Sequence, residues 1–106
     1  MKRELRSAGR FDRKLASLFE ASAGREKELQ ARLDEVVKGL LDGSITKAPQ
    51  HHPMDDTCCL PLIGSFVVVF RPDHASAEEQ NESGKTLINF SHATHFDLLN
   101  IEEEPE

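Results

Sequence analysis

The chain has 106 residues, of which 38% are hydrophobic and 30% charged, and its formal net charge is −6. A chain of this length builds one compact core, so we expect one domain over residues 1–101, followed by an acidic tail over residues 102–106. The overall acidity argues against tight, non-specific binding to RNA or DNA. No apolar run is long enough to cross a bilayer, and none follows the basic N-terminus, so we expect a cytoplasmic protein without a membrane partner.

Basic residues are concentrated in the first half of the chain. Residues 1–47 hold 11 Lys/Arg and 8 Asp/Glu, whereas residues 48–106 hold 2 and 11. Six of the basic residues fall within the first 14 positions. A nucleic-acid surface, if there is one, is therefore expected there, although a solvated helix face would have the same composition.

The hydrophobic pattern of the first half predicts a short strand and two helices. Residues 3–7 suit a strand. Apolar residues then recur at helical spacing over residues 10–21 and again over residues 25–42, where Gly43 supplies a C-terminal cap. Two helices joined by a short loop form an antiparallel hairpin.

The second half predicts strands and loops. Phe66–Phe70 is a β-branched and aromatic run between Gly64 and Pro72, which predicts a buried central strand. Two further strands are expected over residues 58–63 and 86–91. The remaining segments are expected to form a surface loop over residues 44–56, a flexible connection over residues 74–85 and one helical turn within residues 92–99.

The expected fold class is therefore α+β. We expect a small antiparallel sheet of three to four strands, with the N-terminal helical hairpin packed on one of its faces. The predicted core consists of Phe11, Leu15, Leu18, Leu33, Val37, Leu40, Val67, Val69 and Ile88.

Four of the five histidines fall in two short clusters, His51 with His52 and His92 with His95, which this fold could bring to one end of the sheet. Histidine suits proton transfer because its pKa lies near neutrality. Cleavage of RNA needs a base, an acid and positive charge at the phosphate. The alternative to a catalytic role is that His95 is a structural residue that hydrogen-bonds the terminal turn.

The same region contains residue types that bind zinc, because Asp55, Asp56 and Cys58 follow the first histidine pair. Their spacing matches no standard site. An exposed polar loop explains the same residues, so we expect neither a metal nor another cofactor.

Three stretches carry a resemblance to a known family. The segment SAGRFDRKLASL resembles a first strand that runs into an F-x-x-x-L helix, and LPLIGSFVVVFRPD resembles a central strand pair that ends in a basic residue. The segment ATHFDLL is similar to a terminal G-T-H-S-D-L-F motif. Over residues 3–100 the chain thus resembles the RelE/ParE superfamily, the toxins of type II toxin-antitoxin pairs, and most closely its YafQ-like branch.

The resemblance implies a ribosome-dependent mRNA endoribonuclease, an mRNA interferase that inhibits translation and is neutralised by a cognate antitoxin. It implies that His95 is an acid, base or phosphate contact, that His52 is the loop histidine of the site, and that Arg71 clamps the scissile phosphate. We expect these three side chains to converge on one concave surface. The RNA backbone is expected to be held by basic residues of the first helix, namely Arg10, Arg13 and Lys14.

The sequence leaves two alternatives open. A ParE-type toxin has the same fold, cleaves no RNA and inhibits DNA gyrase, and a degenerate toxin would retain antitoxin binding alone. Leu99 stands where the YafQ-like branch has an aromatic residue, and the chain is acidic where ribosome-binding toxins are expected to be basic. The terminal histidine motif favours the endoribonuclease.

Overall fold

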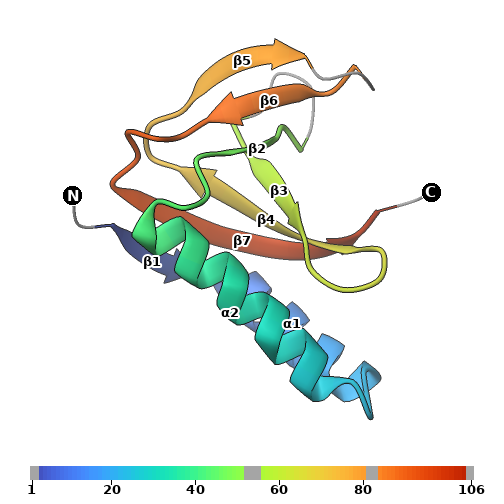
Figure 1. The fold of residues 1–106 in the computed structure, drawn as a ribbon. Helices are drawn as coiled ribbons and strands as arrows, with labels where there is room; N and C mark the ends of the chain where they lie inside the picture. The colour runs from blue at the N-terminus through green and yellow to red at the C-terminus, as the bar shows by residue number, and fades with distance from the viewer. Residues whose placement is uncertain (1–2, 52–55, 81–83, 105–106) are drawn as a thin grey trace.

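The computed structural model describes residues 3–51, 56–80 and 84–104. Within them the fold is α+β, with two helices, a four-stranded sheet and a three-stranded sheet (Figure 1). The elements in chain order are β1 (Glu4–Ser7), α1 (Gly9–Ala21), α2 (Glu26–Asp42), β2 (Lys47–Pro49), β3 (Cys58–Pro61), β4 (Phe66–Pro72), β5 (Ser76–Gln80), β6 (Thr86–Asn89) and β7 (His95–Glu103).

Both predicted helices are present, with ends within one residue of those expected. The helix α2 ends at Gly43, whose φ of 84° is left-handed and favours glycine, as the cap prediction requires. The two helices run in opposite directions on the same side of the molecule (Figure 1). Among the strands, α1 contacts β7 and α2 contacts β1. None of the described helices is both long and apolar enough for a membrane span.

The buried faces of the helices differ in part from the prediction. Phe11, Leu18 and Leu40 are buried as expected, whereas Leu15, Leu33 and Val37 are only half-buried. The helix α2 instead buries Leu29, Val36 and Gly39 beside Leu40. Its core-facing stripe is therefore rotated by about one residue relative to the predicted one.

The four-stranded sheet has the order β1-β7-β4-β3. The predicted central strand is confirmed, because Phe66–Phe70 lies within β4 and pairs with β7 on one side and β3 on the other. The prediction of a purely antiparallel sheet is wrong, because β1 pairs with β7 in parallel. The sheet is therefore mixed.

The three-stranded sheet, of order β2-β6-β5, was not predicted as a separate sheet. The strand β2 lies in the segment expected to be a loop, and β5 lies in the segment expected to be a flexible connection. Both are short, and β5 has the polar sequence SAEEQ, so neither shows the alternation that identifies a strand. The predicted strand at residue 86 is confirmed as β6.

The prediction of a helical turn within residues 92–99 is wrong, because β7 begins at His95 and is the longest strand described. It continues through Glu103, so the acidic segment that was expected to be a tail begins inside the sheet. The pairing with β4 shifts register so that Val69 faces Asn100 and Phe70 faces Leu98. Leu99 is thus the extra residue of a β-bulge.

One hydrophobic core joins both helices and both sheets. It includes Phe70 of β4, Phe90 just after β6, and Phe96 of β7. The three rings meet edge to face, with centroids 5.4 to 6.0 Å apart. The guanidinium of Arg3 lies over the Phe96 ring and donates hydrogen bonds to the carbonyls of Leu40 and Ser91. These contacts connect the N-terminal segment to the end of α2 and to the segment between β6 and β7.

Candidate functional site

Two of the predicted catalytic residues lie on neighbouring strands and on the same face of the four-stranded sheet. Phe96 on β7 and Phe70 on β4 are buried in the core. Since successive strand residues point to opposite faces, His95 and Arg71 point away from the core. His95 is half-buried and Arg71 is exposed. We call this side of the four-stranded sheet, which faces away from the main core, the outer face. Farther along it Cys59, Val67 and Val69 are buried in a second, smaller hydrophobic cluster, so Val67 and Val69 are buried as predicted but outside the main core.

A row of charged residues crosses the outer face at right angles to the strands. Asp97 on β7 lies opposite Arg71 on β4 and opposite Arg6 on β1. His95 lies two residues before Asp97 on the same face, opposite Glu4 of β1. His95 and Arg71 are therefore diagonal neighbours, a relation that brings Cα atoms to about 7 to 8 Å in a sheet. The roles of both in catalysis stay predictions.

Arg71 has a carboxylate partner from outside the sheet. Its Nε donates a hydrogen bond to Oδ1 of Asp56 over 2.9 Å. The two side chains are 46% and 65% exposed, so water screens the pair. A phosphate would have to compete with Asp56 for this edge of the guanidinium.

Asp73, in the turn after β4, anchors the start of β7. Its Oδ1 accepts hydrogen bonds from the backbone N–H groups of Thr94 and His95, over 2.7 and 3.2 Å, and its Oδ2 accepts one from the Thr94 hydroxyl. Partial burial would raise the pKa of Asp73, but these three hydrogen bonds outweigh it and hold the pKa well below its usual range. Thr94 of the ATHFDLL segment is thus an anchor for the backbone of His95.

Two other described histidines, His51 and His92, have their own surroundings apart from His95. His52 lies outside the described residues. The side chain of its neighbour His51 is only 8% exposed, and its Nε2 lies 3.1 Å from Oε2 of Glu102. Glu102 is seven positions beyond His95, so the His51 side chain is directed toward the opposite end of β7 from His95. His92 is exposed and lines a small cavity with His74 beside β5.

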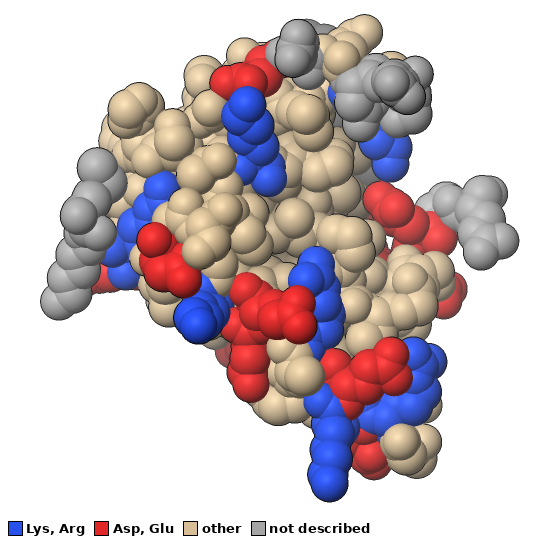
Figure 2. Space-filling model, viewed as in Figure 1, with Lys and Arg blue, Asp and Glu red and all other residues tan. Residues whose placement is uncertain are grey.

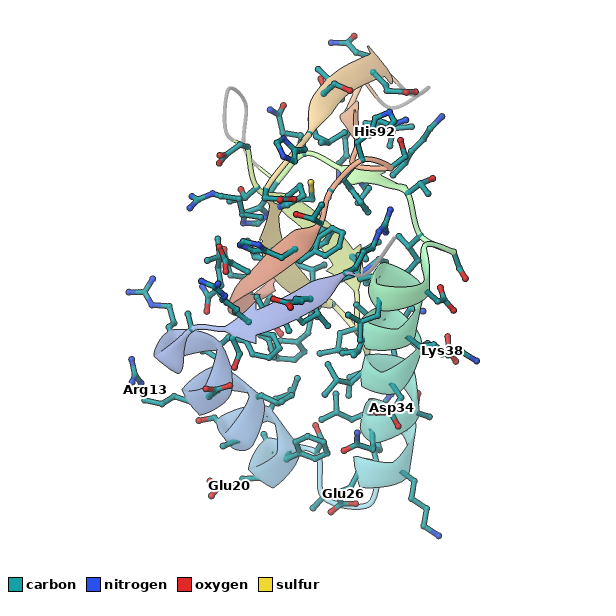
Figure 3. The ribbon with its side chains drawn as sticks, turned by 90° about the vertical axis from the view of Figure 1, so that its left-hand side faces the viewer. Arg13, Glu20, Glu26, Asp34, Lys38 and His92 are labelled. Carbon is teal, nitrogen blue, oxygen red and sulfur yellow. The ribbon has the colours of Figure 1, made fainter. Side chains whose placement is uncertain are left out.

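The basic residues of α1 are exposed, as a binding role requires. Arg10, Arg13 and Lys14 lie in the first half of the helix, and Figure 3 shows Arg13 directed away from the sheets. Lys14 lines a groove of about 450 Å³ between α1 and the ends of β4 and β7, where Glu102 and Glu103 form part of the wall. This groove lies near the opposite end of β7 from His95.

Charges of both signs are mixed over the helices on the face shown in Figure 2. Two exposed ion pairs of α2, Arg25 with Glu28 and Arg32 with Glu35, contribute to this mixture. On the outer face, too, Arg6 and Arg71 stand among the carboxylates of Glu4, Asp56 and Asp97. The basic character of the N-terminal half therefore does not produce a strongly positive surface at the predicted site.

Neither cysteine is placed for reaction or metal binding. Cys58 and Cys59 are free and buried, with Cys58 in the main core. Burial, together with the nearby Glu104 carboxylate, raises the pKa of Cys59 to about 11, so its thiol is protonated near neutral pH. Within the described ranges, no group of three or more His, Cys, Asp or Glu side chains is arranged to hold a metal ion.

The sequence did not indicate how four residues around the predicted site are arranged. Asp56 was considered only as a metal ligand and Asp73 was not considered, because their partners are 15 and more than 20 positions away in sequence. Asp97 belongs to the ATHFDLL segment, but only the strand register brings it and Arg6 beside Arg71. No periodicity signal could have identified these neighbours. No protein-family model, curated protein or solved structure matches this chain.

Proposed function

We propose that this chain is the toxin of a type II toxin-antitoxin pair and that it acts as a ribosome-dependent mRNA endoribonuclease. The observation that supports the proposal is the neighbouring position of His95 and Arg71 on the outer face, which joins a proton-transfer group to a phosphate-binding group. The order of a first strand, two helices and a central strand pair is that of the family the sequence resembles. We also propose a RelE/ParE-like fold and a cytoplasmic location.

The proposed chemistry divides RNA cleavage between the two residues. His95 exchanges a proton with the 2′-hydroxyl or with the leaving 5′-oxygen, and Arg71 stabilises the negative charge that develops on the phosphate. Asp97 lies opposite Arg71 and can hold its guanidinium in place on the sheet. A second proton-transfer group is needed, and His52 remains our candidate for it. Arg10, Arg13 and Lys14 are proposed to hold the RNA backbone.

A specific observation favours the ParE-type alternative, in which the protein inhibits DNA gyrase without cleaving RNA. The Nε of Arg71 is already hydrogen-bonded to Asp56, and the outer face carries Glu4 and Asp97 as well. A site surrounded by carboxylates binds a polyanion weakly. A degenerate toxin that retains only antitoxin binding would show the same features.

The groove beside Lys14 is our candidate for the antitoxin site. Leu18, Phe66 and Ile101 line it with apolar surface, and Glu102 and Glu103 add negative charge at one side. Such a groove suits an amphipathic segment with basic residues on its polar face. We expect a small protein that is encoded by a neighbouring gene and contains such an amphipathic segment to co-purify with the chain and to relieve its toxicity.

The proposal is tested by induced expression in a bacterial host, with transcript cleavage, protein synthesis and the DNA-damage response measured separately. An endoribonuclease should cleave transcripts and stop translation without a DNA-damage response. His95→Ala should reduce cleavage by about 10² to 10⁴-fold, the usual contribution of a general acid or base, while the midpoint of thermal unfolding stays nearly unchanged.

His92→Ala is the matched control, since His92 is an exposed histidine three positions away that does not lie on β7. It should cleave as the wild type does. A DNA-damage response without cleavage would establish the gyrase alternative, and growth without inhibition would rule out an active toxin. Unfolding of His95→Ala would show that His95 is structural.

A further inference from the structure

The guanidinium of Arg71 already holds an oxyanion in this structure, namely the carboxylate of Asp56. The contact runs from Nε of Arg71 to Oδ1 of Asp56 over 2.9 Å. A guanidinium edge presents the same donors to a carboxylate and to a phosphate, and both ligands bind it in similar geometry. The Asp56 carboxylate therefore occupies a position that a phosphate oxygen would otherwise take.

Asp56 is held near Arg71 by its place in the chain. It precedes the buried Thr57, whose carbonyl accepts a hydrogen bond from the His51 amide, and β3 begins one residue later at Cys58. Cys58 lies opposite Phe70, the residue before Arg71. The carboxylate is thus kept at a high effective concentration beside the guanidinium, whatever the strength of the pair itself.

The pair is nevertheless easy to exchange. With the two side chains 46% and 65% exposed, water and salt screen their attraction, and such pairs contribute little to stability. Exchange also changes the local charge. With Asp56 in place, the row of Arg6, Asp97 and Arg71 has a second carboxylate at its Arg71 end, and without Asp56 the row keeps two guanidinium groups and the one carboxylate of Asp97.

We propose that Asp56 is a self-inhibitory carboxylate that competes with a phosphodiester for Arg71, so that the anion site opens only when Asp56 is displaced. The identity of the phosphodiester as RNA rests on the proposed function. The competition itself rests only on the contact between Asp56 and Arg71.

The test measures anion binding separately from cleavage. The purified chain is titrated with inorganic phosphate, followed by the NMR signal of the Arg71 Nε–H group, and with a fluorescent 2′-O-methyl RNA that cannot be cleaved. Asp56→Asn removes the competing charge, keeps the side-chain shape and should tighten both probes by about two- to five-fold, as expected for loss of an exposed ion pair. In an Arg71→Ala background the Asp56→Asn gain measured with the RNA should disappear.

Asp34→Asn provides the matched control. Asp34 is an exposed aspartate on α2 that also accepts one side-chain hydrogen bond, from Gln30. Figure 3 shows Asp34 on the helix, at a distance from His92. It should leave both affinities unchanged. An equal gain from Asp34→Asn would mean that net charge alone is responsible and would overturn the inference.

The remaining outcomes separate the inference from the proposed function. Wild-type affinity in Asp56→Asn, or failure of both variant and wild type to bind either probe, overturns the inference even if transcripts are cleaved in cells. Tighter binding that depends on Arg71, in a protein that cleaves no transcript, supports the inference and refutes the endoribonuclease.

Discussion

The carboxylate of Asp73 holds the first residues of β7 in place and thereby fixes the backbone position of His95. It accepts hydrogen bonds from two backbone amides and from the Thr94 hydroxyl, while its own backbone amide donates to the His95 carbonyl. The turn after β4 is thus bonded to the start of β7 through both the side chain and the backbone of Asp73. This contact gives Thr94 of the ATHFDLL segment a structural role.

The first prediction at the residue scale is that Asp73→Asn destabilises the fold by about 1 to 3 kcal/mol at pH 7, since the hydrogen bonds lose a charged acceptor. The effect should depend on pH. The folded-state pKa of Asp73 lies below the unfolded value of about 3.9, so ionised Asp73 stabilises the fold above that value. This stabilisation is lost as the pH falls toward the folded-state pKa.

Urea unfolding at a series of pH values checks the prediction. The difference in unfolding free energy between wild type and Asp73→Asn should be largest near neutrality and should shrink steadily below about pH 4. A difference that is constant between pH 7 and pH 3 would contradict the role assigned to the charge. Glu78→Gln is a useful comparison, because Glu78 is a hydrogen-bonded carboxylate of the other sheet, with Lys47 and Asn89 as partners.

At the scale of elements, the helices could be predicted because their apolar residues keep a helical period, and β4 could be predicted because it is an uninterrupted β-branched and aromatic run between Gly64 and Pro72. The strand β7 could not, because its bulge breaks the alternation. Phe96 and Leu98 face the core two residues apart, but the next core residue is Ile101, three positions on. A spacing of two and then three is closer to a helical turn than to a strand, which accounts for the wrong prediction.

The short strands of the second sheet illustrate a different limit. The strand β2 has three residues and contains Pro49, and it exists because Lys47, Ala48 and Pro49 pair with β6. Such a strand is stabilised by its partner and by the burial of Ala48 in the core, neither of which is visible locally. The same limit applies to the candidate site, where Asp56 and Arg6 meet Arg71 and Asp97 only through tertiary contacts.

The second prediction concerns the close approach of α2 to the segment that follows it. Gly39 is buried in the helix, its carbonyl accepts a hydrogen bond from the Ile45 amide, and a Cβ placed on Gly39 would overlap Cδ1 and Cγ1 of Ile45. Gly39→Ala gains about 1 kcal/mol of helix propensity but costs about 1 to 3 kcal/mol of overpacking, so it should be neutral to destabilising by about 2 kcal/mol.

An Ile45→Ala background decides between these two effects. Once the clashing atoms are removed, Gly39→Ala should change sign and stabilise the protein by about 1 kcal/mol, because only the helix propensity remains. Chemical denaturation of the four variants measures the coupling. Equal effects of Gly39→Ala in both backgrounds would show that Ile45 does not limit the space at Gly39.

At the scale of the whole molecule, the two sheets depend on one core. Phe90 follows β6 of the three-stranded sheet, and its ring lies 5.5 Å from that of Phe70 and 5.4 Å from that of Phe96, both in the four-stranded sheet. All three rings are fully buried. Core clusters shared in this way couple the unfolding of the elements that contribute to them.

The last prediction is that Phe90→Ala destabilises both sheets together, by about 3 to 5 kcal/mol, since it removes a fully buried ring from the point where they meet. Thermal unfolding should remain a single transition, and amide hydrogen exchange should accelerate in β4 and β7 as well as in β6. Leu41→Ala is the control, because Leu41 is 38% exposed and its truncation should have a small effect on every strand. If faster exchange were confined to β2, β5 and β6, the three-stranded sheet would be an independent unit that packs on the rest, and the shared core would not make the molecule one cooperative domain.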